Sequence, residues 1–534
     1  MSEVLIGQSY FLRFDPKLWE AMQPYPPLGS LYAASWLRAK GHSVAFFDAM
    51  LAESEQDWSQ ALQGSRAPVA ILYEDNFNYL SKMCLLRMRQ AAFTMIEMAR
   101  AKGCTVIVAG SDATDHASLY LDHGADFALL GEGEETLGQL MEHLGGAARP
   151  LEEISGLAWR EDGPSASRLR ANPRRAPLRD LDSLPFPAWD LVEMEKYRQI
   201  WLRRHGYFSL NMVTTRGCPY HCNWCAKPIW GQRYNVRSPQ NVADELAHLQ
   251  QAFGPDHIWF MDDILGLKPG WIEEYADLVE ERSLRIPFKS LNRADLVLRG
   301  EAVDALHRAG ARTVWIGAES GSQRILDAME KGTRVEQVYE AASRLREAGI
   351  EVAFFIQFGY PGETRRDIDL TLKMIRECQP DDIGISVSYP LPGTRFFEAV
   401  KTQLGLQRQW MDSSDLAMLY RGPFDTGFYR KLHAYVHREF RARGAWRELR
   451  RRWGRNGRRA TAPRRAREKS TAGVMRSLLT NFLLIPPTRL QLEFLSRRPH
   501  RGLGPLQPDM RPDEAASPSP QPEEAPAGSA ARLP

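Results

Sequence analysis

The sequence predicts an α/β protein built from two successive domains whose strands are parallel. Short, almost continuously apolar segments alternate with segments of helical spacing, first over residues 1–150 and again over 206–400. Such apolar runs are typical of parallel strands that are covered on both faces. Beyond residue 400 the alternation stops. We therefore expect a helical region over 401–450 and a largely disordered tail, first Arg-rich and then Pro/Ala-rich, over 451–534.

The composition agrees with a folded chain that does not span a membrane. Among the 534 residues, 43% are hydrophobic and 25% are charged, which is ordinary for globular domains. The sequence has no stretch of about 18 uncharged apolar residues, and Met1-Ser2-Glu3 does not begin a basic segment of the secretory type. We expect a cytoplasmic protein. The formal net charge of +3 hides a concentration of arginine after residue 438.

The first domain is expected to be a doubly wound sheet. Gly41 and Gly103 end two of its helices, as glycine commonly does at a helix C-terminus. Ligands of such sheets bind beyond the carboxyl ends of the strands. The expected strands are 4–7, 44–48, 69–73, 105–110 and 127–130, and the clearest helices are 28–40 and 88–102.

A proline- and arginine-containing linker over 151–205 leads to the second series of strands. Six strand–helix units follow, which suits a partial (β/α)6 barrel with its active site at the carboxyl ends of the strands. The expected strands are 209–215, 257–262, 288–292, 313–317, 351–358 and 382–387.

Three of the six cysteines form a cluster with the spacing C-x3-C-x2-C directly after the first strand of the barrel. They are Cys218, Cys222 and Cys225. Three thiolates on one loop can ligate three irons of a [4Fe–4S] cluster and leave the fourth iron open to a small chelating molecule. Zinc is the alternative, with His221 as a fourth ligand, although His221 lies between two of the cysteines.

This loop resembles the cluster motif of the radical S-adenosylmethionine (SAM) superfamily, C-x3-C-x-aromatic-C, with Trp224 at the aromatic position. The resemblance implies a radical SAM barrel in which Cys218, Cys222 and Cys225 are the catalytic, metal-ligating residues of a [4Fe–4S] cluster. It also implies that the open iron binds SAM, and that the reduced cluster cleaves SAM to a 5′-deoxyadenosyl radical.

Two later strand ends, 259–263 and 315–322, resemble segments that meet SAM in this superfamily. The resemblance implies that Asp262, Glu319 and Ser320 bind the cofactor. For Asp262, capping of a helix after the strand is an equal alternative. Glu319 is the stronger candidate, because a buried glutamate at a strand end is costly without a partner.

Residues 1–150 resemble the cobalamin-binding domains that precede radical SAM barrels. The matching pieces are 26–29, 41–42, 47–49 and 131–136. For the Gly-Glu-Gly-Glu string alone, a glycine turn with acidic residues in the first helical turn is the alternative. A flavodoxin-like sheet alone would also suit a flavin or a nucleotide. The resemblance implies cobalamin contacts at Leu28, Gly29, Asp48, Gly131, Glu132, Gly133 and Glu134.

The D-x-H-x-x-G motif, with which many cobalamin domains supply a histidine to cobalt, does not occur in this sequence. The resemblance therefore implies cobalamin without a protein histidine on cobalt. The loop over 73–79 is expected to face the lower side of the corrin. Such a cobalt favours the cycle in which Co(I) takes a methyl group from SAM.

The two resemblances together imply a cobalamin-dependent radical SAM methyltransferase. One SAM would methylate cobalt and a second would be cleaved at the cluster. The resulting radical would activate an otherwise unreactive carbon, which takes its methyl group from methylcobalamin. The rival hypothesis is an oxidation or ring closure of the anaerobic magnesium-protoporphyrin cyclase type, because 412–418 and 424–430 resemble the C-terminal region of that group.

RNA methylthiolation is a weaker hypothesis, because those relatives carry three more cysteines in the N-terminal domain, where this chain has Cys84 and Cys104. We expect a small-molecule or peptide substrate, an external electron donor of the flavodoxin or ferredoxin type, and no specific nucleic acid. The arginine-rich tail is expected to be solvated, with weak contact to a membrane surface.

Overall fold

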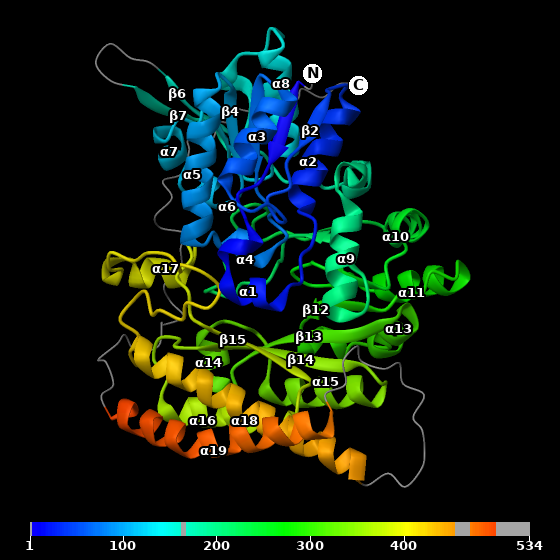
Figure 1. The fold of residues 1–534 in the computed structure, drawn as a ribbon, viewed down its shortest axis with the longest axis vertical. Coiled ribbons are helices and arrows are strands. Elements are labelled where there is room, and N and C mark those ends of the chain that lie inside the picture. Colours follow the sequence, from blue (N-terminus) through cyan, green and yellow to red (C-terminus); the bar gives the residue numbers. More distant parts are fainter. Residues whose placement is uncertain (1–2, 162–166, 454–469, 498–534) are drawn as a thin grey trace, which may run out of the picture.

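The computed structural model describes residues 3–161, 167–453 and 470–497. Two sheets follow each other along the long axis of the molecule (Figure 1). The N-terminal sheet occupies one end, the second sheet lies below it, and two long C-terminal helices lie at the opposite end. The two sheets therefore belong to domains that meet at an internal interface.

The first sheet has seven strands in the order β2-β1-β3-β4-β5-β6-β7. Its first five strands are parallel, and their order confirms the predicted doubly wound, flavodoxin-like sheet. These strands are β1 (Val4–Gly7), β2 (Val44–Phe46), β3 (Val69–Tyr73), β4 (Thr105–Ala109) and β5 (Phe127–Leu129).

Part of the expected linker over 151–205 extends this sheet. It contributes the antiparallel strands β6 (Leu157–Glu161) and β7 (Arg168–Ala171). All four residues of β7 are exposed. The strand therefore lacks the apolar pattern by which the sequence could reveal it.

Helices cover both faces of the first sheet, because its strands are apolar on both sides. The helices of this domain are α1 (Pro16–Ala21), α2 (Leu28–Ala39), α3 (Glu55–Ser65), α4 (Tyr79–Met83), α5 (Leu86–Ala101), α6 (Ser111–Asp115), α7 (Ala117–Asp122) and α8 (Glu134–Leu144). Of these, α1 and α4 pack toward the core of the barrel. One core, which includes Leu37 and Leu140, joins the sheet to α2 and α8. A second core, which includes Trp58 and Met95, joins it to α3 and α5.

The second sheet has six parallel strands in the order β15-β14-β13-β12-β11-β8, which confirms the predicted partial (β/α)6 barrel. Each strand neighbours the next one along the chain, as right-handed strand–helix–strand units require. The strands are β8 (Ser209–Met212), β11 (His257–Phe260), β12 (Phe288–Asn292), β13 (Ala311–Glu319), β14 (Glu351–Phe358) and β15 (Asp382–Val387).

The two domains are joined by α9 (Met194–His205), and a short antiparallel pair, β9 (Thr215–Arg216) with β10 (Asn235–Val236), brackets the cysteine loop. The helices that follow the barrel strands are α10 (Pro239–Phe253), α11 (Trp271–Glu281), α12 (Ala294–Val297), α13 (Ala302–Ala309), α14 (Gln323–Ala328), α15 (Val335–Glu347), α16 (Arg365–Cys378) and α17 (Arg395–Val400).

The C-terminal region contains α18 (Thr426–Trp453) and α19 (Thr471–Ser496), which lie side by side against the outside of the barrel (Figure 1). The composition from residue 451 predicts a largely disordered tail, and α19 departs from that prediction. The arginine-rich segment over 454–469 and the chain end over 498–534 lie outside the described residues. Among the described helices, none is both long and apolar enough to cross a bilayer.

Candidate active site

The three clustered cysteines lie on the loop that follows β8 and β9, at the carboxyl end of the barrel. Cys218, Cys222 and Cys225 are half-buried and free. In the described part of the chain, no three His, Cys, Asp or Glu side chains gather closely enough to hold a single metal ion. A [4Fe–4S] cube takes one thiolate per iron, so its ligands do not have to converge on one point. Three thiols on one loop therefore fit three corners of such a cube.

Asn223, inside the cysteine loop, anchors that loop to three other parts of the barrel. Its backbone N–H donates to Met329 O at 3.1 Å, and its carbonyl accepts from Phe396 N–H at 3.0 Å. Its side-chain amide donates to Ala328 O at 2.8 Å and accepts from the Tyr360 hydroxyl at 2.8 Å. The loop is therefore held from the ends of α14 and β14 and from the start of α17. Asn223 lies within the motif, but no sequence signal marks it as an anchor of the loop.

Gly217 allows the loop to leave β9. Its φ is +85°, a region that side chains other than glycine rarely adopt. A Cβ there would collide with the carbonyl oxygen of Arg233. The bend just before Cys218 therefore requires glycine.

We expect Gly217→Ala to lose most iron and most SAM cleavage, because the Arg233 carbonyl would push the cysteine loop out of place. Iron content per chain after anaerobic reconstitution is the measurement. Gly231→Ala is the matched control, since Gly231 also has positive φ (+65°), but among the described residues no neighbouring atom lies within 4 Å of an added Cβ. Equal iron content in the two variants would show that the Arg233 contact does not matter.

Asp262, which follows β11, is buried and holds the backbone that leads into the cysteine loop. One carboxylate oxygen accepts from the Thr214 and Thr215 N–H groups, both at 2.7 Å. Both threonine hydroxyls donate to the same carboxylate. Burial raises the pKa of Asp262 to about 6, and these hydrogen bonds oppose the rise. The structure thus shows Asp262 as a positioning residue, and its contact with SAM stays a prediction.

Two lysines reach the cysteine loop from different elements. Lys82 of α4 forms a 2.7 Å ion pair with Asp263, which links the N-terminal domain to the barrel. Lys331, which follows α14, forms a 2.8 Å ion pair with Glu319 at the end of β13. Burial raises the pKa of Cys225 to about 12, and the positive charges of Lys227 and Lys82 oppose that rise. Nearby lysines favour the deprotonated form of these cysteines, and the thiolate is the form that ligates iron in an iron–sulfur cluster.

Glu319 is a strained residue at the carboxyl end of the barrel. It adopts φ +56°, and the pairing of β13 with β14 is irregular between Gly317 and Glu319. Such strain in a residue other than glycine is often found at functional sites. A buried glutamate requires a partner, and here that partner is Lys331, which carried no sequence signal of its own.

Ser320 lies next to Glu319 and is almost fully buried. Its hydroxyl is 3.2 Å from the Thr371 hydroxyl and accepts from the Ser322 N–H. The structure therefore shows Ser320 within a turn network, and its predicted SAM contact remains untested.

Trp224, the aromatic residue of the motif, packs between two small apolar clusters, one with Ile325 and Tyr360 and one with Phe396 and Tyr420. Its indole N–H is buried and has no hydrogen-bond partner within the described structure. An unpartnered buried donor normally has a partner in the working protein. Trp224 lies beside Cys225, so its indole N–H could donate to a polar group of a ligand bound there.

Two of the predicted cobalamin-contacting glycines, Gly29 and Gly133, lie in close contact with β3 and the loop that follows it. A Cβ on Gly29, at the start of α2, would lie 2.9 Å from Glu74 O. A Cβ on Gly133 would lie 2.8 Å from the Tyr73 hydroxyl. Leu28 is fully buried, and the Gly29 N–H donates to Asp75 at 3.1 Å. These residues bring α2 and the turn before α8 against the loop after β3.

Asp48 accepts a 2.8 Å hydrogen bond from the Tyr197 hydroxyl of α9. Burial raises its pKa to about 6, and that hydrogen bond opposes the rise. In this structure Asp48 joins the end of β2 to the interdomain helix. Its predicted contact with cobalamin stays a prediction.

Glu132 and Glu134 reach across the domain interface to Arg216, two residues before Cys218. The ion pairs measure 2.5 and 2.7 Å, and the three side chains are only 4–7% exposed. Burial raises the pKa of Glu132, and the guanidinium opposes that rise. The turn after β5 is therefore tied to the cysteine loop. Gly131, with φ +85°, opens this turn.

The carboxyl edge of the first sheet contains buried polar atoms that have no partner in the described structure. They are the hydroxyls of Ser9, Tyr10 and Ser81 and one carboxylate oxygen of Glu134. Such atoms are costly to bury alone. A ligand with many amide groups, as cobalamin is, fits this edge because it can donate to and accept from them.

Glu363, in the turn between β14 and α16, should make the free energy of unfolding depend on pH. It accepts a 2.8 Å hydrogen bond from the Gly359 N–H, and its other carboxylate oxygen is buried without a partner among the described residues. Burial raises its pKa from 4.5 to about 8. Between pH 4.5 and about 8, the Glu363 carboxyl group stays protonated in the folded chain but is ionised in the unfolded chain. The stabilisation is therefore complete below pH 4.5 and is lost as the pH rises to about 8.

We expect the wild-type free energy of unfolding to fall across this range by up to about 1.4 kcal/mol per pH unit from this group. Glu363→Gln should remove that slope, and Glu336→Gln, at an exposed residue of α15, should keep it. Denaturant unfolding at several pH values measures the slope. The same slope in all three proteins would disprove the assignment to Glu363.

Comparison with known proteins agrees with this geometry. Residues 212–375 match the radical SAM superfamily. An uncharacterized methyltransferase of Pyrococcus horikoshii is 27% identical over 72% of this chain and 81% of its own. An anaerobic magnesium-protoporphyrin IX monomethyl ester cyclase of Rubrivivax gelatinosus is 26% identical over 70% of this chain and 66% of its own.

Two solved structures share the arrangement of both domains. The cobalamin-dependent SAM radical enzyme OxsB superposes with a TM-score of 0.65 at 16% identity, over 93% of this chain and 75% of its own. The radical SAM methyltransferase TsrM from Kitasatospora setae superposes with a TM-score of 0.60 at 19% identity, over 76% of this chain and 75% of its own. Residues 212–375 therefore match the radical SAM superfamily, and the two-domain fold of the chain resembles the folds of OxsB and TsrM.

Proposed function

We propose that this chain is a cobalamin-dependent radical SAM methyltransferase that methylates an unactivated carbon. The observation that carries the proposal is the position of the cysteine loop. It lies at the carboxyl end of the barrel and is joined by Arg216 to the carboxyl edge of a doubly wound sheet. Ligands of both kinds of sheet bind at these ends, so two cofactors would face each other across one interface.

When bound, the [4Fe–4S] cluster would supply reductive cleavage of SAM to a 5′-deoxyadenosyl radical, and the cobalamin would supply the methyl group. The protein residues hold these groups in place. Cys218, Cys222 and Cys225 would ligate the cluster, and Asn223 and Asp262 fix the loop that carries them. Ordinary methyl transfer from SAM requires a nucleophilic acceptor, so two metal cofactors are needed only when the acceptor carbon is not a nucleophile.

The relatives support this proposal. TsrM, which has the same two-domain fold, is described with cobalamin and a [4Fe–4S] cluster bound, and the P. horikoshii relative is named a methyltransferase. A hopanoid C-3 methylase of Methylococcus capsulatus also matches, at 26% identity over 71% of this chain. We also propose that the protein is cytoplasmic and that an external electron donor of the flavodoxin or ferredoxin type reduces the cluster.

Isotope tracing tests the proposal. Reconstituted protein is incubated with methyl-labelled SAM, cobalamin, a reductant and extracts that contain candidate substrates. We expect 5′-deoxyadenosine and a product that carries the methyl label. The R. gelatinosus relative favours a second candidate, an oxidative cyclase, for which oxygen from labelled water would enter the product instead. Protein that binds no corrinoid, with activity indifferent to added cobalamin, would contradict both candidates.

A further inference from the structure

The C-terminal helix α19 is apolar on two faces, which is unusual for a helix on the surface of a soluble domain. One face, with Val474, Thr488 and Leu492, is buried against the rest of the protein. On α19 the charged residues are Arg476, Arg489 and Glu493, and the last forms a 3.3 Å ion pair with Arg365 of α16. The helix therefore carries few charged side chains for its length.

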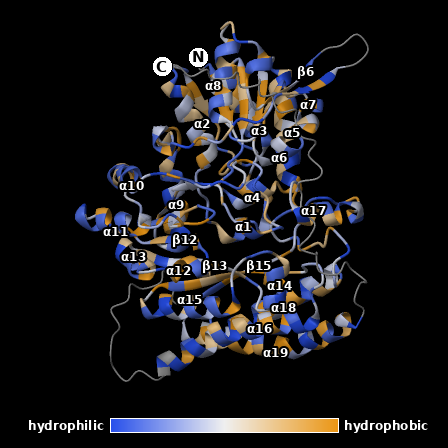
Figure 2. Cartoon of the chain, turned by 180° about the vertical axis from the view of Figure 1, so that it is seen from behind, coloured by the Kyte–Doolittle hydropathy of each residue, from blue (hydrophilic) through white to orange (hydrophobic). Residues whose placement is uncertain are grey.

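A second set of apolar residues on α19 is exposed. Their spacings of three, four and seven residues place them on one side of the helix, which we call the outer stripe. The exposed fractions are 42–71%. Figure 2 shows apolar residues along α19 at this end of the molecule. The outer stripe consists of Met475, Leu479, Phe482, Leu483, Leu490 and Phe494.

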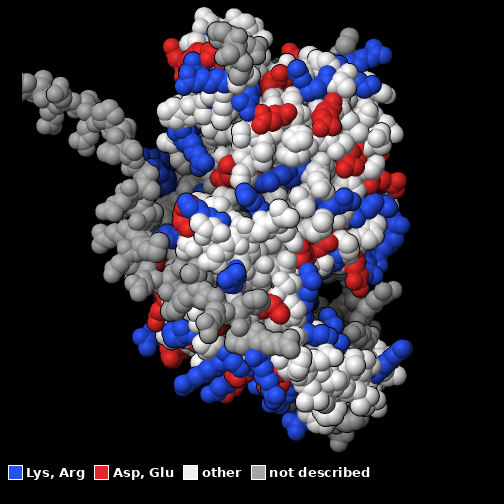
Figure 3. All heavy atoms as spheres, turned by 90° about the vertical axis from the view of Figure 1, so that its left-hand side faces the viewer, with Lys and Arg blue, Asp and Glu red and all other residues white. Residues whose placement is uncertain are grey.

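Basic residues surround the outer stripe. Arg476, Arg489 and Arg497 are exposed on α19 or at its end. Figure 3 shows Lys and Arg side chains gathered at the lower end of the molecule, where Figure 1 places α18 and α19. The segment that connects these two helices is itself rich in arginine in the sequence.

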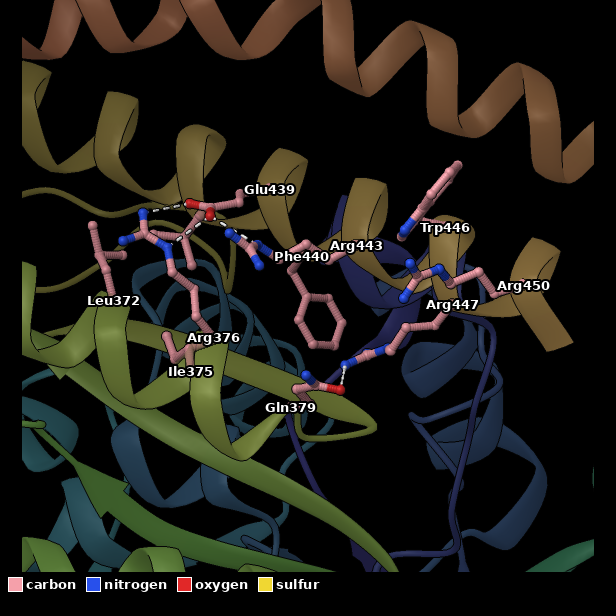
Figure 4. A pocket seen from close by; sticks show the side chains of 11 residues that line it. Leu372, Ile375, Arg376, Gln379, Glu439, Phe440, Arg443, Trp446, Arg447 and Arg450 are labelled. Atoms are coloured by element: carbon pink, nitrogen blue, oxygen red, sulfur yellow. Dashed lines mark hydrogen bonds and ion pairs between the residues drawn. The ribbon is translucent and has the colours of Figure 1, made fainter.

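Helix α18 carries arginines as well, on the side that faces α16. A cavity of about 170 Å³ between α16 and α18 is lined by Arg443, Arg447, Arg450 and the half-exposed Trp446 (Figure 4). Glu439 is ion-paired with Arg376 and Arg443, which neutralises part of this charge. Arg450 and Arg443 are exposed to solvent. A tryptophan among arginines is a common arrangement where a protein meets lipid headgroups.

We propose that the outer stripe of α19 docks on an anionic membrane surface. The apolar side chains would enter the boundary between headgroups and acyl chains, while the surrounding arginines contact anionic headgroups. The arginines around the outer stripe favour a membrane over a second copy of the chain as the binding partner. Two copies that faced each other through this surface would bring like charges together. The helix would lie on the membrane and not cross it. This proposal does not depend on the reaction that the barrel catalyses.

Vesicle binding by the full-length protein tests the proposal. We expect the protein to float with vesicles that contain phosphatidylglycerol, to float poorly with phosphatidylcholine alone, and to lose binding as salt rises. Leu483→Glu and Phe482→Glu should each weaken binding by about tenfold or more, because each removes a large inserted side chain and adds a negative charge. Circular dichroism checks that the variants keep their helices.

Gln491→Glu is the matched control, because it adds the same charge on an exposed residue of α19 outside the outer stripe. Its binding should stay within about twofold of wild type. Equal weakening in all three variants would show that charge alone acts and would overturn insertion of the outer stripe. A wild-type dimer that Leu483→Glu dissociates, together with no vesicle binding, would overturn the proposal in favour of a contact between copies.

Discussion

Replacement of Cys218, Cys222 or Cys225 by alanine is expected to abolish SAM cleavage. Each thiolate would ligate one iron of the cube, and a cube with only two protein ligands is not held on the loop. Iron and sulfide content per chain and the yield of 5′-deoxyadenosine with a strong reductant measure the effect. We expect both to fall to background in every one of the three variants.

Cys378→Ala is the control for these variants, since Cys378 is a buried cysteine of the same barrel, on α16. It should keep wild-type iron content and SAM cleavage. Thermal unfolding of the unreconstituted proteins shows that each variant still folds. Retained cleavage in any cysteine-loop variant would refute that residue as a ligand, and with it the radical chemistry that we propose.

Arg216→Met is expected to destabilise the folded chain by about 3–5 kcal/mol, because it leaves Glu132 and Glu134 buried without their partner. The free energy of unfolding from denaturant titration near neutral pH is the measurement. Since Arg216 also joins the two domains, the unfolding of the N-terminal domain and that of the barrel should separate into two transitions. Domain-specific tryptophan fluorescence or hydrogen exchange can resolve them.

Two further variants test the cause of that loss. Arg174→Met removes an arginine that is half-exposed and 3.9 Å from Asp115, so it should cost less than about 1 kcal/mol. The triple variant Glu132→Gln, Glu134→Gln and Arg216→Met removes all three charges and should recover much of the stability. If it is as unstable as Arg216→Met alone, unpaired charge is not the cause.

The prediction from sequence succeeded where the signal is local. Parallel strands covered on both faces are continuous apolar runs, so β1, β3, β13 and β14 could be located within a residue or two. It failed where a segment lacks the pattern that is typical of its secondary structure. The strand β7 is fully exposed, and α19 has two prolines inside it, Pro486 and Pro487, so neither matches a standard pattern.

The candidate site divides in the same way. The three cysteines lie within eight residues of one another, and Gly217 directly precedes the first of them. The sequence alone therefore identifies the cluster loop. The partners of Asp262 and Glu319 lie 47 and 12 residues away along the chain. Those of Arg216 lie more than 80 residues away, in the other domain. No periodicity connects such positions, because long-range pairing depends on how the elements pack.

The sequence by itself therefore determined the order of the two α/β domains, the cluster loop and the glycines of the tight turns, since each rests on neighbouring residues. Only the tertiary structure decided that Glu132 and Glu134 meet Arg216, that Asp262 positions the cysteine loop, and that α19 leaves an apolar side exposed. The physical reason is that ion pairs, buried hydrogen bonds and exposed surface are properties of residues brought together by folding, whatever their separation along the chain.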